Sequence, residues 1–273
     1  YAPYARYLAP LLNLRNASPL LARLAEPVIG MSRHRKLPRW RFWSFSQTAA
    51  RVPEAWRPEK FTTESPQRNG RQGPFACDPP KVAVLFADTF NRTFEPENLD
   101  DTLYVLEALG YSVSVAGAGE RRPLCCGRTY LAAGLVEEAK AEARRMLAAL
   151  AEPLRLGLPI VGIEPSCLLT LRDEFLAMGL GEPAGKLAAS SFLLEEFLVR
   201  EAKAGRIGDV LGRLDGTAHL HTHCHQKAFG AAGAVEQTLR MVEGLTVKPI
   251  ESGCCGMAGS FGYQAETYDV SMA

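Results

Sequence analysis

From Lys81 onward, the chain alternates between short apolar runs and longer segments with apolar residues at helical spacing. The runs KVAVLFAD, YSVSVAG and LPIVGIEP are nearly continuous in hydrophobic residues, as is typical of strands buried in a parallel sheet. The segments PENLDDTLYVLEALG, AGLVEEAKAEARRMLAALA and SCLLTLRDEFL that follow them have the spacing of amphipathic helices. This alternation predicts an α/β fold in which helices cover a parallel sheet.

The same plan recurs toward the C-terminus. AHLHTHC and TVKPIES have the pattern of strands, and KAFGAAGAVEQTLRMVEGL between them has the pattern of a helix. In both parts the second strand is followed by the tripeptide CCG. The sequence therefore predicts a tandem repeat of two similar parallel-sheet half-domains, a first half over residues 81–180 and a truncated second half over residues 205–273. KLAASSFLLEEFLVREAKAG predicts a connecting helix over residues 181–204.

Residues 1–80 have a different pattern, rich in Arg, Pro and Trp. LLNLRNASPLLARLAEPVIG has roughly helical spacing, whereas the prolines around it favour extended backbone and FTTESPQRNGRQGPFACDPP favours a linker. An Arg- and Trp-rich arm is compatible with contact to nucleic acid, but we favour an arm that packs on another domain through its aromatic residues. Because the chain lacks an initiator Met and ends without a cap or tail, we expect it to be a piece of a longer protein.

Composition narrows the possible functions. The 273 residues are 47% hydrophobic and 22% charged, with a net charge of +1, which gives no support for bulk nucleic-acid binding. No apolar run approaches the roughly 18 residues of a membrane span, and no secretion signal is visible. Seven cysteines in such a chain favour a reducing compartment, where clustered cysteines more often bind metals or act as catalytic thiols than form disulfides.

Six of the seven cysteines lie in turns flanked by glycine, proline or histidine: Cys125, Cys126, Cys167, Cys224, Cys254 and Cys255. Cys77, in a proline-rich linker, is interpreted as a thiol without a specific role. The six follow predicted strands, and sites in open α/β sheets gather beyond the carboxyl ends of strands, so we expect them to converge. Thiolates are the usual ligands of iron–sulfur clusters and of structural zinc.

Adjacent cysteines can bind two irons of one cluster, whereas both chelating one zinc is awkward, so we favour iron–sulfur and keep zinc as the alternative. Glycines beside the ligands let the backbone approach a cluster and donate to its sulfides: Gly127, Gly253 and Gly256.

These motifs resemble the CCG cysteine-rich domain family, whose repeat consists of a leading Cys, then CCG, then CxxC. The stretches FADTFNRTFEPEN, PLCCGRTYLAAGLVEEAK, GIEPSCLLTLRDEF, HCHQKAFG and CCGMAGSFGY are similar to the C-terminal part of fused flavin and iron–sulfur enzymes of the FAD-linked D-lactate dehydrogenase type. The family includes iron–sulfur subunits of glycolate oxidase, heterodisulfide reductase and anaerobic glycerol-3-phosphate dehydrogenase. The resemblance implies a cluster of the 4Fe-4S type, with FAD and ferredoxin-like domains elsewhere in the full-length chain and a connector in residues 1–80 that packs on them.

The first half departs from the family pattern. Asp88 stands where the family has its leading cysteine, and Glu164 takes the first position of CxxC. Carboxylates are poorer partners for an iron–sulfur cluster than thiolates, and either residue can instead cap a helix or orient a turn, which is the interpretation that we favour. The resemblance makes Cys224, Cys254 and Cys255 the principal ligands, with Cys125, Cys126 and Cys167 forming a site of lower affinity. The closing CxxC of the second half is absent because the chain ends before it.

Four histidines lie around Cys224. We interpret His219 and His221 as buried, hydrogen-bonded histidines at a strand end. For His223 and His225, a role beside the metal ligands, a nitrogen-ligand role and a structural role all stay open. Lys227 and Arg172, near helix starts, are interpreted as solvated and are not assigned to the site.

The leading hypothesis is an electron-transfer module. Electrons from a flavin that has oxidised a 2-hydroxy acid of the D-lactate or glycolate type would pass toward a quinone or another carrier. The alternatives are a thiol/disulfide module like heterodisulfide reductase, and a zinc-stabilised scaffold. The expected location is the cytoplasm or the inner face of the membrane, and we expect this chain alone to lack dehydrogenase activity and to bind its cluster weakly.

Overall fold

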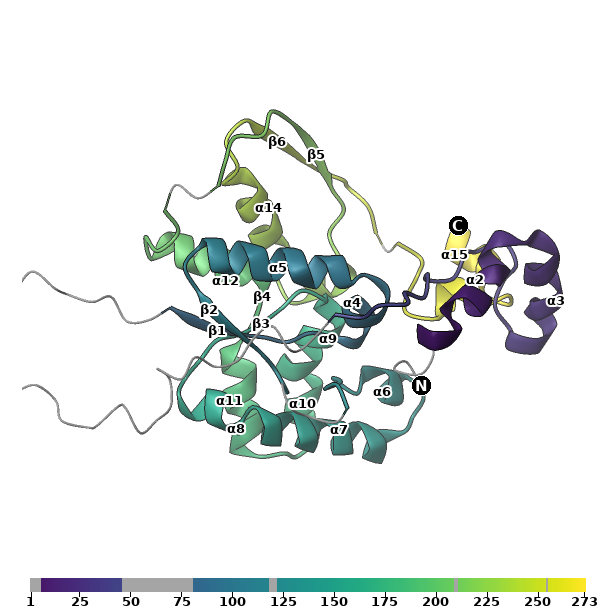
Figure 1. Cartoon of the computed structure of the whole chain (residues 1–273), viewed down its shortest axis with the longest axis horizontal. Coiled ribbons are helices and arrows are strands. Elements are labelled where there is room, and N and C mark those ends of the chain that lie inside the picture. Colours follow the sequence, from purple (N-terminus) through teal and green to yellow (C-terminus); the bar gives the residue numbers. More distant parts are fainter. Residues whose placement is uncertain (1–5, 46–80, 118–121, 209–210, 254) are drawn as a thin grey trace, which may run out of the picture.

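A four-stranded parallel sheet forms the centre of the fold (Figure 1). The computed structural model describes residues 6–45, 81–117, 122–208, 211–253 and 255–273. The strand order is β2 (Ser112–Val115), β1 (Val82–Leu85), β3 (Ile160–Gly162) and β4 (Ser191–Leu193). All three pairings are parallel, with β1 in the interior. The predicted α/β class with a parallel sheet is therefore confirmed.

Helices cover both faces of this sheet. Successive side chains of β1 point to opposite faces, and all four of its residues are buried, so both faces need an apolar cover. Val84 belongs to the apolar layer under one group of helices, and Leu85 belongs to the layer under the other group. The first group comprises α6 (Arg128–Ala132), α7 (Val136–Ala149), α8 (Ala151–Arg155), α9 (Pro165–Arg172), α10 (Glu174–Ala177) and α11 (Glu182–Ser190). The second group comprises α5 (Pro96–Ala108) and α12 (Leu194–Lys203). In Figure 1 the two groups lie below and above the sheet.

The second half contains a smaller sheet of two parallel strands, β5 (Gly216–Leu220) and β6 (Leu245–Pro249). Between them the chain forms α13 (Cys224–Ala228) and α14 (Ala232–Arg240). The predicted order of strand, helix, strand and CCG is thus present, although one predicted helix is divided in two near Gly230, whose φ is 69°. A four-stranded and a two-stranded sheet do not confirm a repeat of two similar half-domains.

The segment expected to form one connecting helix instead contains α11, β4 and α12. Ser191 and Leu193 pair with β3, so this segment completes the first sheet. The hydroxyl of Ser191 donates to the carbonyl of Leu187 at 2.7 Å, at the point where the helix gives way to the strand. The prediction of a continuous helix is therefore wrong, because pairing with β3 overrides the helical pattern of these three residues.

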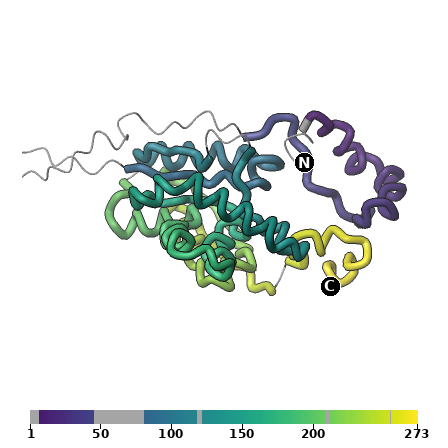
Figure 2. Tube along the Cα trace, turned by 90° about the horizontal axis from the view of Figure 1, so that it is seen from below, coloured from purple at the N-terminus to yellow at the C-terminus, as the bar shows by residue number. Residues whose placement is uncertain are grey.

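The N-terminal arm rests on the C-terminal end of the chain (Figures 1 and 2). Its helices are η1 (Arg6–Leu8), α2 (Ala9–Ala17) and α3 (Pro19–Ile29), and the C-terminal end contains η5 (Phe261–Tyr263) and α15 (Tyr268–Met272). The amide of Ser32 donates to the carbonyl of Tyr263 at 2.7 Å, and the amide of Ala265 donates to the carbonyl of Gly30 at 2.8 Å. The arm is therefore helical over residues 6–29 and without helix over residues 30–45, in agreement with the expected helical and extended segments, and the expected linker lies outside the described residues.

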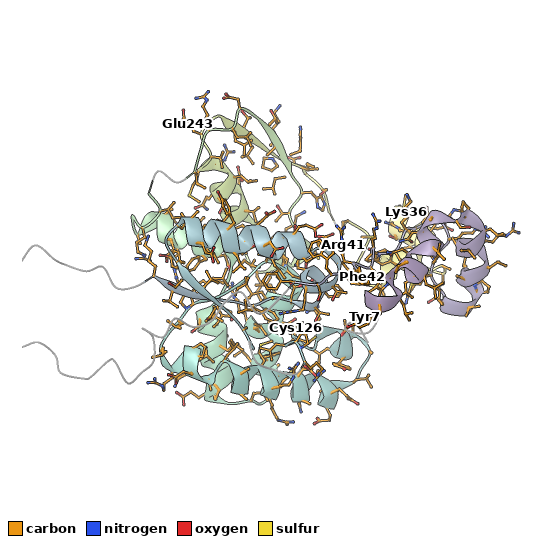
Figure 3. All side chains as sticks on the ribbon, viewed as in Figure 1. Tyr7, Lys36, Arg41, Phe42, Cys126 and Glu243 are labelled. Carbon is orange, nitrogen blue, oxygen red and sulfur yellow. The ribbon has the colours of Figure 1, made fainter. Side chains whose placement is uncertain are left out.

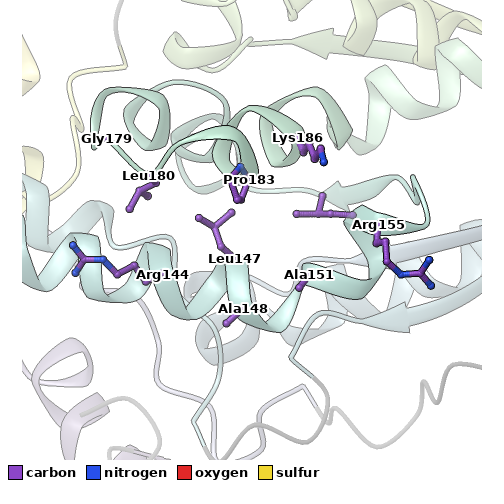
Figure 4. A pocket seen from close by; sticks show the side chains of 10 residues that line it. Arg144, Leu147, Ala148, Ala151, Arg155, Gly179, Leu180, Pro183 and Lys186 are labelled. Carbon is purple, nitrogen blue, oxygen red and sulfur yellow. The ribbon is translucent and has the colours of Figure 1, made fainter.

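An open groove of about 620 Å³ runs between α7–α8 on one side and α11 with the loop before it on the other (Figure 4). Leu147, Leu180 and Pro183 line it, with Arg144 and Lys186 also in the lining. Among the described residues that line it, none is a cysteine, a histidine or an acid. The groove therefore takes no part in the candidate site.

Candidate metal centre

The structure brings the three cysteines of the first half together. Cys125 and Cys126 follow β2, and Cys167 lies in the first turn of α9, directly after β3. Because β2 and β3 flank β1, both segments leave the same edge of the sheet. The Cys126 thiol is hydrogen-bonded with those of Cys125 and Cys167, and we call these three residues the first cysteine cluster. Figure 3 shows Cys126 within the α/β part of the molecule.

Burial sets the chemistry of this cluster. Cys126 and Cys167 are each 3% exposed, whereas Cys125 is half-buried. The hydrogen bond with Cys126 and burial raise the pKa of Cys125 well above its usual range. The hydrogen bond with Cys125 lowers the pKa of Cys126, but the bond with Cys167 and burial outweigh it, so this pKa is raised too. As free thiols, both remain protonated at neutral pH and are poor nucleophiles.

Backbone amides of the CCG turn face the sulfurs. The N–H of Gly127 lies 3.5 Å from Cys125 Sγ, and the N–H of Arg128 donates to Cys126. Gly127 has a φ of 77°, and a Cβ at this position would lie 3.2 Å from the backbone of Ala139 on α7. Only glycine fits here without strain. Buried thiols with backbone N–H donors are a suitable ligand set for an iron–sulfur cluster.

Asp88 and Glu164 both cap helices. Asp88 is 1% exposed and precedes α4 (Thr89–Phe94). Its carboxylate accepts hydrogen bonds from the amides of Phe90 and Asn91, both at 2.9 Å, and from the Asn91 side chain at 2.8 Å. Glu164 accepts from the amide of Ser166 at 3.2 Å and caps α9. The capping interpretation is thus confirmed for both.

Both carboxylates also lie near the first cysteine cluster. The bond with Cys126 lowers the pKa of Cys167, but burial and the negative charges of Asp88 and Glu164 together raise it. Burial likewise raises the pKa of Asp88, although the hydrogen bonds from Asn91 oppose this effect. Because the caps hold these oxygens, they fix the helices beside the thiols and do not replace the missing cysteines as free donors.

In the second half, Cys224 is the first residue of α13 and is exposed. His223 caps this helix, because its Nδ1 accepts from the amide of His225 at 3.1 Å. Lys227 Nζ donates to the carbonyls of Ser252 at 2.7 Å and Gly253 at 3.3 Å. Lys227, which the sequence did not assign to the site, thus ties α13 to the turn that leads into the second CCG.

Two of the three residues of that second CCG are described. Cys255 is exposed, and Cys254 lies outside the described residues, as does Cys77. Gly256 has a φ of 74°, and a Cβ there would lie 2.2 Å from the carbonyl oxygen of Ser271. Gly127 and Gly256 therefore share a left-handed backbone and a close backbone neighbour.

Arg128 joins the two halves, and the sequence analysis missed it. It directly follows the first CCG, and its guanidinium reaches His225 Nε2 at 3.0 Å, 97 positions along the chain. The same group donates to the Thr170 hydroxyl at 3.3 Å and to the Glu174 carboxylate. Because α13 also contacts α9, Cys224 lies on a helix packed beside the first cysteine cluster. Its position directly after CCG was the available signal.

The remaining predicted residues separate into two groups. One nitrogen of His223, one nitrogen of His225 and Cys224 Sγ all lie within 4.8 Å of one another. His219 and His221 are exposed, so the interpretation of both as buried histidines is wrong. The reason is that β5 belongs to a two-stranded sheet with little cover. Arg172 forms an ion pair with Glu196 at 2.6 Å on the far end of α9, which leaves it outside the site.

Comparisons with known proteins show which proteins share this cysteine motif. The family model of the CCG cysteine-rich domain matches residues 87–172, which include the first cysteine cluster. One subunit of the anaerobic glycerol-3-phosphate dehydrogenase of Escherichia coli K12 is 24% identical over 266 residues, which are 97% of this chain and 61% of the relative. Lactate utilization protein A of Geobacillus kaustophilus is 33% identical over 185 residues, which are 65% of this chain and 72% of the relative.

D-2-hydroxyglutarate dehydrogenase of Escherichia coli K12 is 24% identical over 193 residues, which are 70% of this chain and 18% of the relative. The chain therefore spans only part of these relatives. No solved structure matches the chain significantly. Within the described residues, every helix is too short or too polar to cross a membrane.

Proposed function

Since this chain belongs to the family of proteins with the CCG cysteine-rich domain, we propose that it holds an iron–sulfur centre through which a dehydrogenase passes electrons. The observation that carries the proposal is the first cysteine cluster, in which three thiols lie together under two backbone N–H donors. An iron–sulfur cluster would supply reversible electron transfer at this place. The chain's part is to hold the sulfurs, to direct amides at them and to limit access of water.

The proposed ligands come from both halves of the chain: Cys125, Cys126, Cys167, Cys224, Cys254 and Cys255. The resemblance favours Cys224, Cys254 and Cys255 as the principal set, whereas the burial and mutual contacts of the first cysteine cluster support that cluster as well. Gly127, Gly253 and Gly256 would allow close approach of the backbone. The contact of Arg128 with His225 supports a site to which both halves contribute.

The names of the relatives suggest the electron donor. One is a subunit of an anaerobic glycerol-3-phosphate dehydrogenase, one is a D-2-hydroxyglutarate dehydrogenase, and a third is named for lactate utilization. We therefore propose a flavin-linked enzyme for a 2-hydroxy acid as donor, with a quinone or another carrier as acceptor. FAD and ferredoxin-like domains would belong to the full-length chain, at the cytoplasmic face of the membrane or in the cytoplasm.

The N-terminal arm offers a surface for such a domain. Leu11, Leu20, Leu24 and Val28 on α2 and α3 are 64%, 65%, 61% and 82% exposed. Apolar side chains this exposed on adjoining helices are typical of surfaces that another domain covers. This supports the proposed connector role of residues 1–80. We further propose that residues 81–180 and 205–273 are the two cysteine-bearing parts, and that residues 181–204 join them.

Thiol/disulfide chemistry and metal ligation both require a thiolate, so the raised pKa of Cys125 and of Cys126 does not separate these two functions, whereas the metal content of the protein does. An iron–sulfur protein is coloured and a protein that holds only zinc is colourless, so a visible spectrum separates these two alternatives. The test is anaerobic purification of the full-length protein, followed by a visible spectrum and assays of iron, zinc and acid-labile sulfide. We expect a broad absorption band that dithionite bleaches, with iron and sulfide present. A colourless protein that contains zinc would overturn the proposal.

Replacing Cys254 and Cys255 with serine, or Cys126 with serine, should lower iron and sulfide and abolish electron transfer to the acceptor. Reduction of the flavin by substrate should remain. Cys77→Ser is the matched control, and we expect normal iron content for it. Unchanged iron and unchanged electron transfer in both ligand variants, the Cys254 and Cys255 double replacement and Cys126→Ser, would contradict the ligand assignment.

A further inference from the structure

One imidazole nitrogen of His225 has a partner, and the other has none. Nε2 lies 3.0 Å from Nη2 of Arg128. A guanidinium carries only hydrogen-bond donors, so Nε2 must be the acceptor in this contact. The proton of the neutral ring therefore resides on Nδ1, and Arg128 fixes this tautomer.

Nδ1 of His225 is enclosed by protein and has no hydrogen-bond partner among the described residues. Leaving a buried N–H unpaired is unfavourable, and most buried polar groups in proteins avoid it. A donor held in one tautomer without an acceptor therefore indicates a missing acceptor. The candidate acceptor is the sulfur of Cys224, because Cys224 Sγ, one nitrogen of His223 and one nitrogen of His225 all lie within 4.8 Å of one another.

We propose that His225 donates a hydrogen bond from Nδ1 to a metal-bound sulfur at the Cys224 centre, and that Arg128 is the positioning residue that directs this proton. The inference rests on the proposed iron–sulfur function and adds the residue that tunes the centre. Hydrogen bonds to cluster sulfurs favour the reduced, more negative state and so raise the reduction potential.

The contact with Arg128 also decides between two roles for His225. A neutral histidine that binds a metal through Nδ1 carries its proton on Nε2 and donates from there. Arg128 has no acceptor to receive that proton, and it already donates to Thr170 and Glu174 on the other side. His225 is thus a donor to sulfur and not a metal ligand.

The test compares His225→Phe with His221→Phe in the full-length, iron-loaded protein. His221 is an exposed histidine four positions away and serves as the matched control. We expect His225→Phe to keep its iron, to show a more negative midpoint potential, and to lose one exchangeable-proton coupling in the ENDOR spectrum of the reduced centre. His225→Asn should restore part of the coupling, because its amide N–H can occupy a similar position to Nδ1–H.

The role of Arg128 is tested by the same exchangeable-proton coupling. The charge of Arg128 could shift the potential directly, but it does not itself produce this coupling. Arg128→Met should weaken the coupling in the wild-type background and have no effect on it in the His225→Phe background. Arg172→Met, which removes an arginine of α9 that pairs with Glu196 on α12, is the control and should leave the coupling unchanged.

Two outcomes are separable. A wild-type protein without iron would overturn the proposed function and this inference together. An iron-loaded His225→Phe variant with unchanged potential and unchanged exchangeable-proton coupling would overturn the inference alone. Loss of iron in His225→Phe and in His225→Asn, with normal iron in His221→Phe, would make His225 a ligand and would also overturn the inference.

Discussion

Replacing Gly127 with alanine tests whether the first CCG turn is held against α7. The backbone at Gly127 has a φ of 77°, and a left-handed conformation costs an alanine about 1–2 kcal/mol. The new Cβ would also lie 3.2 Å from both Cα and O of Ala139 and 3.5 Å from Cβ of Glu142. Two of these contacts are with helix backbone that cannot rotate away, so overpacking should add about 1–3 kcal/mol.

Gly134→Ala separates the two contributions. Gly134 has a nearly identical φ of 76°, and a Cβ there would meet nothing within 4 Å. We expect Gly134→Ala to lose only the conformational part, about 1–2 kcal/mol, and Gly127→Ala to lose about 2–5 kcal/mol. Urea denaturation followed by far-UV circular dichroism measures both free energies of unfolding.

We expect the loss of stability to be accompanied by a loss of iron at Gly127 but not at Gly134. Displacing the turn at Gly127 moves the N–H that lies 3.5 Å from Cys125 Sγ, so iron content should fall in Gly127→Ala and stay normal in Gly134→Ala. Equal destabilisation by the two substitutions, with equal iron content, would show that the turn is not wedged against α7 and would refute this reasoning.

Three further predictions concern the sheet, the caps and the chain as a whole. Burial tends to raise the pKa of Glu201, but hydrogen bonds from Arg206 and Tyr111 outweigh this effect and lower the pKa to about 2. The ionised carboxylate of Glu201 therefore stabilises the fold above pH 4.5, and this stabilisation is lost as the pH falls toward 2. Arg200 also pairs with Glu201, and both arginines are partly exposed, so water screens these ion pairs. Glu201→Gln should therefore cost about 2 kcal/mol at pH 7, and this cost should vanish in acid urea titrations; a constant difference across pH would contradict it. Asp88→Ala should cost about 1–2 kcal/mol in the same assay by removing the cap of α4, whereas an unchanged stability would exclude that role. Residues 1–273 alone should show no lactate or glycolate dehydrogenase activity, and turnover without added flavoprotein would disprove this.

Hydrophobic pattern predicted the first sheet well because its strands are buried on both faces. β1 and β3 are continuous apolar runs, and only such runs can fill the space between two helical layers. β4 was not predicted, because its own sequence does not have the pattern of a strand. Ser191–Leu193 continues a helical pattern, and its strand conformation comes from pairing with β3, about thirty residues upstream, which local periodicity cannot express.

The site was predictable where local chemistry decides the role of a residue. Asp88 and Glu164 cap helices through contacts two or three positions away, and the capping alternative could be read from the sequence. Arg128 was not predictable, because its role depends on a contact with His225 across 97 positions. The exposure of His219 and His221 also depends on tertiary structure, since strand alternation alone cannot reveal that a two-stranded sheet has little cover.

The adjacency of two cysteines before a glycine now has a structural explanation. Cys125 is half-buried and bonds to Thr89 and to the amide of Gly127, whereas Cys126 is buried and bonds to Cys167. One short segment thus presents two thiols to different neighbours, which a single chelated ion would not require but a cluster with several metal atoms can use. The left-handed glycine after them turns the chain so that the next N–H faces back toward Cys126. Since the φ angle of Gly256 is also positive, the second CCG has the local geometry to direct its amides in the same way.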